Sequence, residues 1–215
     1  MGIKVLKGRN VKVEVATAFS VAKAVTGVTK ANPGVATSAA HGFVSGQVGY
    51  FDVSAGMVEL DGQAATADST TANTFDLTDI DTRNYTTFTA GNFVPVQTWA
   101  TLANSTKVDI AGGEASKMDV TTLLDTLRQE ENGMLAAQSV SIDLLAEQVS
   151  NAAAKALRTA ARDGSYVLVR VTYPNGSRRI FRGQPSLPGE STSIDQEVSG
   201  SLSITVKGFV VATDI

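Results

Sequence analysis

Alternation of apolar and polar positions predicts strands at both ends of the chain. Residues 11–15 alternate valine with charged residues, which is typical of a strand with one buried and one solvent-facing side. Residues 166–173 and 201–212 alternate in a similar way, and a Pro-Asn-Gly-Ser segment at 174–177 precedes a further β-type run at 178–183. Because Asn-Gly favours the tight turns of β-hairpins, we expect a hairpin there.

Three further strands are predicted in the second half of the chain. Residues 106–111 and 116–121 flank the glycine pair at 112–113, which indicates a turn between two strands. The polar stretch at 128–133 is typical of a loop, and residues 134–142 after it form the third predicted strand.

One segment has the period of an amphipathic helix. Asp143 is placed to cap its start, Glu147 lies in its first turn and Gly164 ends it, in agreement with the helix dipole. Its apolar positions recur every three or four residues, at Leu145, Val149, Ala152, Ala153, Ala156 and Ala160.

The segment at 20–96 differs in composition from the sequence on either side. It is rich in small residues, and between residues 44 and 96 it carries seven acidic residues and one basic residue. Short β-type stretches recur in it at intervals of about eight to twelve residues, separated by turn signals. Because long insertions at exposed loops cost little closure entropy, we predict an inserted small β domain at 20–96 within a β domain built from 1–19 and 97–215.

Composition restricts the chemistry that the chain can perform. It has 215 residues, no cysteine and one histidine, which excludes disulfides, thiolate metal sites, thiol catalysis and multi-histidine zinc sites. The net charge of −3 argues against a dedicated nucleic-acid binder, and the abundance of Val, Thr, Ser, Ala and Gly favours a mainly β fold. The sequence shows no signal peptide and no apolar run of 18 residues, so we expect no membrane association and no export by that route.

Three motifs suggest chemistry, but each has a simpler structural explanation. Residues 20–23 match Ser-x-x-Lys without the companion motifs of the enzymes that use it. His41 lies in a turn-like Ala-His-Gly context, so we expect its ring to bond to the backbone. Asp76, Asp79 and Asp81 could gather around calcium, yet the EF-hand pattern is missing, which favours a solvated acidic surface. We expect no catalytic residue, no cofactor and no metal site.

Basic residues concentrate between residues 151 and 183, where seven of them accompany one acid, Asp163. This group could hold phosphate or pair with an acidic surface of a second copy. The aromatic residues expected of a single-strand binder are missing from it, and the rest of the chain is acidic, which favours pairing between copies. The predicted inter-subunit contacts are Lys155, Arg158, Arg162, Arg178, Arg179 and Arg182.

The order of the predicted elements is informative. A basic N-terminal strand, a β region led by Trp99, a strand ending at 118–121, a polar loop and a helix precede the Tyr-Pro-Asn-Gly hairpin at 173–183, which contains a Phe-x-Gly motif. A Ser/Pro-rich loop and a final strand near 207–209 follow. This order resembles the major tail tube proteins of long, non-contractile-tailed bacteriophages.

The inserted segment has a likeness of its own, carried by residues 28–37, 40–46, 57–62, 73–75 and 81–91. These stretches resemble a small β module that recurs in phage structural proteins, and the module is similar to the first catalytic cysteine half-domain of ubiquitin-activating enzymes. Because the chain has no cysteine, the likeness implies no enzymatic role.

The tail tube resemblance implies a mainly β fold, a β-sandwich or half-barrel with one flanking α-helix and the inserted domain on the tube exterior. It implies a structural virion protein, six copies of which form a ring. Stacked rings would form the conduit through which double-stranded DNA passes without specific binding. The implied partners are the tape-measure protein and tail-terminator or tail-tip proteins, and the implied location is the virion tail, assembled in the host bacterial cytoplasm.

Two other classes of function remain open from the sequence. A carbohydrate-binding or adhesive β protein would need aromatic platforms, and the chain offers one Trp, four Tyr and eight Phe, mostly at core-like spacing. A hydrolase would need a catalytic set that one histidine and no cysteine cannot supply, although a glycosidase with two carboxylates is compatible with the composition.

Overall fold

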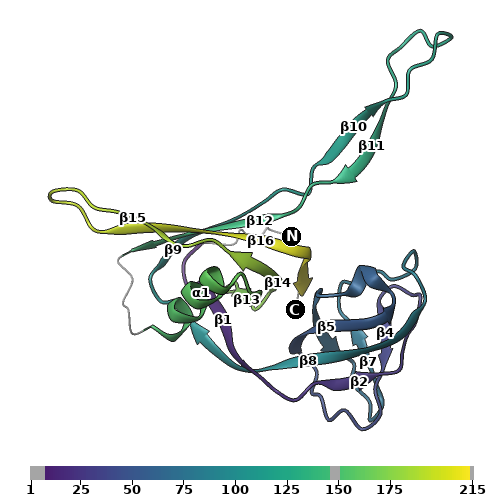
Figure 1. The fold of residues 1–215 in the computed structure, drawn as a ribbon, viewed down its shortest axis with the longest axis horizontal. Coiled ribbons are helices and arrows are strands. Elements are labelled where there is room, and N and C mark those ends of the chain that lie inside the picture. Colours follow the sequence, from purple (N-terminus) through teal and green to yellow (C-terminus); the bar gives the residue numbers. More distant parts are fainter. Residues whose placement is uncertain (1–7, 146–150, 214–215) are drawn as a thin grey trace, which may run out of the picture.

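The computed structural model describes residues 8–145 and 151–213 and has a mainly β fold with a single α-helix among those residues (Figure 1). Most strands belong to one 14-stranded antiparallel sheet, whose main path has the order β3-β4-β7-β6-β5-β8-β1-β13-β14-β16-β12-β9. The fold class predicted from the sequence is therefore confirmed. We call the two halves of this sheet the body and the module. Two hairpins project from the body, and we call them the first arm, whose β10 and β11 form a separate two-stranded sheet, and the second arm.

The body contains the helix and the longest strands. Its elements are β1 (Lys12–Phe19), the second half of β8 (Phe88–Thr101), β9 (Ser105–Ala111), β12 (Ser139–Leu145), α1 (Ala152–Asp163), β13 (Val167–Thr172), β14 (Arg178–Pro185) and β16 (Ser199–Thr213). The module consists of the first half of β8 with β2 (Lys23–Val25), β3 (Gly27–Val28), β4 (Gly34–Thr37), β5 (Gln47–Gly56), a short 3-10 helix (Val58–Leu60), β6 (Ala64–Asp68) and β7 (Thr74–Leu77).

The arms are hairpins that leave the body in different directions (Figure 1). The first arm, residues 112–138, contains β10 (Ala115–Asp119) paired with β11 (Glu130–Leu135). The second arm, residues 186–198, contains β15 (Gly189–Ser191), which pairs with the start of β16.

The core of the body follows from strand alternation. Since successive side chains of a strand point to opposite faces, every second residue of these strands is apolar and buried on the inner face. Helix α1 packs its buried side, Ala153, Ala154, Leu157 and Ala160, against this face. The strand residues of the core are Val13, Val15, Val140, Ile142, Leu144, Val167, Val169, Val171, Phe181, Leu202, Ile204 and Val206.

The module has a separate core built on aromatic rings. Phe93 lies at 5.2 Å from the ring centroids of Phe43, Phe51 and Phe75, and all four side chains are buried. Such edge-on and tilted contacts are favourable beyond the apolar area they bury. Val211 of β16 is also part of this cluster, so the body contributes to the core of the module.

Module and body are joined through the outer face of the body sheet. Ala16, Leu168 and Ile180, on the opposite side of their strands from the main core, pack against Val48 and Ala64 of the module. Strand β8 pairs with β5 through its first half and with β1 through its second half. The domain boundary predicted between residues 96 and 97 thus falls within one continuous strand, and the division into two domains stays a prediction.

The helix begins later than its sequence pattern predicts. Asn151 caps it by accepting hydrogen bonds from the amides of Ala153 and Ala154, and Gly164 ends it with a φ of 64°. The prediction that Asp143 caps the helix is wrong. Asp143 lies in β12, where it is paired with Lys107 and Ser201. The predicted first-turn residue Glu147 lies outside the described residues.

Two local predictions in the region of the first arm are wrong. The glycine pair at 112–113 does not close a hairpin, since β9 pairs with β12 and β10 pairs with β11. The strand predicted at 134–142 is divided between β11 and β12, and part of the polar loop at 128–133 is strand. Alternation identifies a strand but not its partner, which is why the arm was missed.

We predict that Phe93→Ala lowers the free energy of unfolding by about 3–5 kcal/mol, because the lost ring contacts leave a cavity among the other phenylalanines. Urea denaturation of the unassembled chain measures the change. The matched control is Val58→Ala, whose side chain is 70% exposed, and it should shift stability by no more than about 0.5 kcal/mol. Equal effects of the two substitutions would contradict the assigned module core.

Candidate assembly surfaces

The part of the outer face of the body sheet that the module does not cover is polar. Residues paired directly across neighbouring strands lie on the same face, and here the pairs form three rows across β9, β12 and β16. Most of these side chains are exposed. The rows are Ala111, Ser139 and Thr205, then Asp109, Ser141 and Ser203, then Lys107, Asp143 and Ser201.

This polar face has small side chains and little net charge. Lys107 lies 3.6 Å from the Asp109 carboxylate, so its charge is partly offset within the face. Hydroxyl groups of this kind remain hydrated and give no apolar area for a tight contact. The face is therefore suited to stay wet and to bind weakly.

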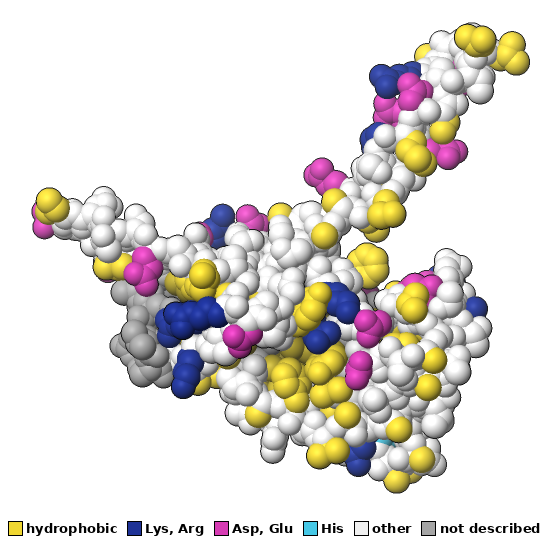
Figure 2. Space-filling model, viewed as in Figure 1, with side chains coloured by type: hydrophobic (Ala, Val, Ile, Leu, Met, Phe, Trp, Pro, Cys, Tyr) yellow, Lys and Arg dark blue, Asp and Glu magenta, His cyan; other side chains and the backbone are white. Residues whose placement is uncertain are grey.

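The first arm ends in apolar side chains that contact little of their own chain. Leu123, Leu124 and Leu127 at its tip are 106%, 93% and 75% exposed, and Met134 on β11 is 86% exposed. Figure 2 shows these hydrophobic groups at the end of the arm. Grouped apolar side chains exposed to this degree indicate an interaction site.

The second arm combines an apolar tip with acidic residues. Ile194 is 93% exposed and Leu187 is 58% exposed. Its charged residues are all acidic, namely Glu190, Asp195 and Glu197.

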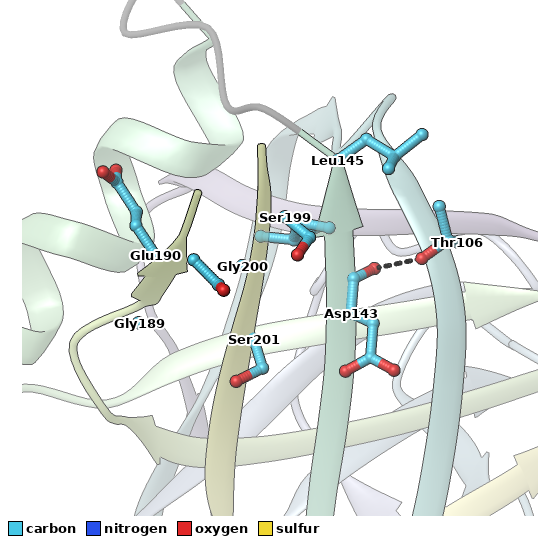
Figure 3. A pocket seen from close by; sticks show the side chains of 10 residues that line it. Thr106, Asp143, Leu145, Gly189, Glu190, Ser199, Gly200 and Ser201 are labelled. Atoms are coloured by element: carbon cyan, nitrogen blue, oxygen red, sulfur yellow. Dashed lines mark hydrogen bonds between the residues drawn. The ribbon is translucent and has the colours of Figure 1, made fainter. Parts of the chain in front are cut away.

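A shallow groove of about 400 Å³ lies between the root of the second arm and β12 (Figure 3). Thr106 donates a hydrogen bond of 3.2 Å to the backbone carbonyl of Asp143 at one wall. Figure 3 shows the carboxylates of Asp143 and Glu190 pointing away from each other. The groove therefore lacks the two facing carboxylates that glycoside hydrolysis needs.

The basic residues predicted to contact other subunits fall into two groups. Lys155, Arg158 and Arg162 lie on α1, and Figure 2 shows a cluster of Lys and Arg side chains over this helix. Lys155 and Arg162 are exposed, and Arg158 is half-buried.

The second group lies on β14, and the side chains of two of its members, Arg179 and Arg182, have partners within the chain. The guanidinium of Arg182 lies 4.1 Å from the ring centroid of Tyr50 and 4.7 Å from that of Tyr166, so it joins module and body by cation–π contacts. Arg179 bonds to the carbonyl of Arg178 and lies 5.9 Å from the Tyr173 ring. A role of Arg178, Arg179 and Arg182 between subunits stays a prediction.

Polar contacts complete the junction between module and body. The side-chain amide of Gln63, which is 2% exposed, both donates to the Phe209 carbonyl and accepts from the Phe209 amide, at 2.9 and 2.8 Å. This approach needs glycine at 208, where φ is 77° and a Cβ would collide with the amide. Lys207 bonds to Asp61 at 2.9 Å.

The remaining candidate motifs have structural roles. His41 is buried, accepts a hydrogen bond from the Phe43 amide at 2.8 Å and packs on Phe75, as predicted for a turn residue. Residues 20–22 lie outside any helix or strand and Lys23 begins β2, so the segment lacks the helical turn that a Ser-x-x-Lys nucleophile requires. Asp79 accepts from the Ala212 amide and Asp81 pairs with Arg83.

No group of His, Asp and Glu side chains in the described ranges could hold a metal ion. No described helix is long and apolar enough to cross a membrane.

Sequence reasoning missed the two arms and the polar face as surfaces. The leucines at 123, 124 and 127, within a polar stretch, were a signal for an exposed apolar tip. The serines of the final strand, which alternate with apolar residues, were a signal that one of its faces is exposed to solvent. Which strand lies beside them depends on non-local pairing.

Comparison with known proteins identifies the family. A sequence model described as "Phage tail tube protein, TTP" matches residues 55–212, which is more than half of the chain. The chain belongs to the phage tail tube protein family. It is thus a structural component of a phage-type tail and not an enzyme.

Solved structures similar to this tail tube protein come from gene transfer agent (GTA) particles. One is the tail of an empty GTA particle, computed with helical refinement and C6 symmetry, at 19% identity and a TM-score of 0.46, covering 55% of this chain and 88% of that chain. Another is the virion of a native GTA particle, at 21% identity and a TM-score of 0.43, covering 54% and 89%. The comparison with curated proteins gives no match.

The Asp61–Lys207 contact predicts a pH-dependent junction. Partial burial raises the pKa of Asp61, but hydrogen bonds from Lys207 and the Val53 amide, with nearby cations, lower it by more, so this pKa lies below its usual 3.8. Ionised Asp61 therefore stabilises the fold above the unfolded pKa, and this contribution is lost as the pH falls through the folded pKa. Because both side chains are about a third exposed, the effect is at most about 1 kcal/mol.

We predict that Asp61→Asn lowers the free energy of unfolding near neutral pH and that its difference from the natural chain disappears as the pH falls through the lowered pKa of Asp61. Denaturant titrations of the unassembled chain across this range measure the difference. Asp52→Asn removes an exposed carboxylate and serves as the control. A difference for Asp61→Asn that is the same at every pH would contradict the assignment.

Proposed function

We propose that six copies of this tail tube protein close into a ring, that rings stack into a tube, and that double-stranded DNA passes through the lumen without specific binding. The tape-measure protein would occupy the lumen during assembly in the host bacterial cytoplasm. Tail-terminator or tail-tip proteins would bind the tube ends. The proposal rests on family membership together with surfaces that the single chain leaves unsatisfied.

The observation that carries self-assembly is the first arm. Burying the side chains of Leu123, Leu124 and Leu127 would contribute about 1.5–3 kcal/mol each. In the single chain these side chains remain in water. Monomeric proteins rarely expose grouped apolar side chains of this kind, so the tip is expected to bind a partner. In a homo-oligomer, each copy provides a binding surface for the tip of another copy.

Strand edges support the same conclusion. Strand β9, of seven residues, is the last strand on the main path of the sheet and pairs with β12 on one side. Unpaired edges invite uncontrolled association, which closure into a ring limits to a defined number of copies.

The polar face of β9, β12 and β16 is our candidate for the tube lining. Fixed phosphate contacts by cations would retain DNA through counterion release, so a conduit needs few of them. The three rows across this face contain one lysine, Lys107, which lies beside Asp109. Hydroxyl groups keep water at the surface instead of binding phosphate by charge.

The module is proposed to lie on the tube exterior as an inserted β domain. Its support is the resemblance of the element order to tail tube proteins, together with its position over β1, β13 and β14, which leaves the rows of β9, β12 and β16 uncovered. We also retain the likeness to the cysteine half-domain of ubiquitin-activating enzymes as a proposal about architecture alone, supported by the module's own aromatic core.

We predict that Leu123→Ser, Leu124→Ser and Leu127→Ser combined prevent tube formation, because the arm then has no apolar tip to bury. Negative-stain electron microscopy and sedimentation of the purified protein measure assembly. Val58→Ser, an equally polar change at a side chain 70% exposed on the module, should leave assembly intact. Tubes of normal length from the triple variant would refute the role of the arm.

The absence of cysteine allows a direct test of the lining. We predict that Ser203→Cys in assembled tubes reacts with a small maleimide but not with a maleimide carried on a globular protein. Val58→Cys on the module should react with both reagents, and unassembled chains of either variant should also react with both. Rapid reaction of Ser203→Cys in tubes with the large reagent would place this face outside the lumen.

A further inference from the structure

We infer that the acidic first arm of one copy docks on the basic face of α1 of a second copy. This inference rests on the proposed self-assembly and assigns both partners of one contact. It identifies the acidic surface that the basic residues of α1 meet.

The first arm carries an excess of negative charge away from its own body. The arm has two cations. One of them, Arg128, lies 3.2 Å from Asp119 and 3.6 Å from Glu130 and is therefore already paired within the arm. Glu114 and Glu131 are exposed, and neither has an ion pair within the described part of the chain. The charged residues of the arm are Glu114, Lys117, Asp119, Asp125, Arg128, Glu130 and Glu131.

Local hydrogen bonds keep the arm ionised. The Thr121 side chain and amide lower the pKa of Asp119, and the Thr122 amide and hydroxyl lower the pKa of Asp125. Asp119 and Asp125 therefore keep their negative charge to lower pH than an ordinary aspartate.

Helix α1 offers a complementary face. Ala152, Lys155, Thr159, Arg162 and Asp163 are exposed, and their spacing places them on one side of the helix, where two cations accompany one acid. The small side chains at 152 and 159 leave room beside the two cations, so an extended ribbon can approach the helix. The opposite side of α1 is anchored in the body core.

The first arm and α1 do not contact each other within one chain. The first arm leaves the body on the side away from α1 (Figure 1). The arm extends away from the body, and its residues 112–124 reach up to about 40 Å at 3.3 Å per residue. A contact between two different surfaces is heterologous, and repeated copies of it produce a ring or a filament.

The second arm is the competing acidic partner, but its place in the fold disfavours it. It leaves the body on the same side as α1 (Figure 1), so it is less suited to a head-to-tail contact. The arginines of β14 are the competing basic partner. Arg182 is held between two tyrosine rings within the chain, which leaves α1 as the more accessible basic surface.

A charge exchange in the full-length chain tests the contact. The first variant carries Lys155→Glu and Arg162→Glu, the second carries Glu114→Lys and Glu131→Lys, and the third combines all four. We expect each pair alone to raise the concentration needed for tube formation by about tenfold or more, and the combination to restore it to within about threefold of the natural chain. Light scattering and electron microscopy measure tubes, and circular dichroism verifies folding.

Controls separate the possible failures. If a glutamate variant misfolds, Lys155→Gln with Arg162→Gln replaces it and should still weaken assembly. Rescue of the α1 variant by Glu190→Lys with Glu197→Lys, and not by the first-arm changes, would overturn the assignment in favour of the second arm.

If the natural chain forms tubes and both charge-reversed variants assemble equally well, the docking inference is overturned and the proposed function is not. The same holds if the four changes together fail to restore assembly. Failure of the natural chain to form any ring or tube would overturn the proposed function, and the docking inference with it.

Discussion

The structure depends on which parts of the two faces of one antiparallel sheet are buried and which remain exposed. Side chains of each strand alternate, so every strand of the body supplies both an inner and an outer surface. The inner surface is buried around Val169, Ile204 and helix α1. The outer surface is divided: the module covers β1, β13 and β14, and the hydroxyl-rich rows of β9, β12 and β16 stay exposed. One constraint thus produces a core, a seat for the module and a wet surface.

The module is bound to this sheet by several kinds of contact at once. It shares strand β8 with the body and buries Val211 of β16 in its own core. The side-chain amide of Gln63 also forms hydrogen bonds with the backbone amide and carbonyl of Phe209. Arg182 between Tyr50 and Tyr166 adds cation–π contacts at the rim. The module therefore forms a continuous sheet with the body.

Polarity is distributed in a manner that suits assembly. The two arms project apolar tips and negative charge, whereas α1 presents Lys155 and Arg162 to solvent. Because the arms leave the body and their tips are exposed, they add little to the core of the single chain. The polar face, by contrast, has little apolar area, and its one lysine lies beside Asp109, so this face is suited to remain hydrated.

The sequence by itself determined the strands with clear alternation, the Asn-Gly hairpin, the turn role of His41 and the mainly β class, because each depends on neighbouring residues and on period. It also determined the exclusion of thiol and multi-histidine chemistry, which depends on composition. Only the tertiary structure decided the start of the helix at Asn151, the position of Asp143 in a strand, the division of residues 134–142 between β11 and β12, and the existence of the arms. These features depend on which strands pair across long separations, and alternation within a strand carries no information about its partner.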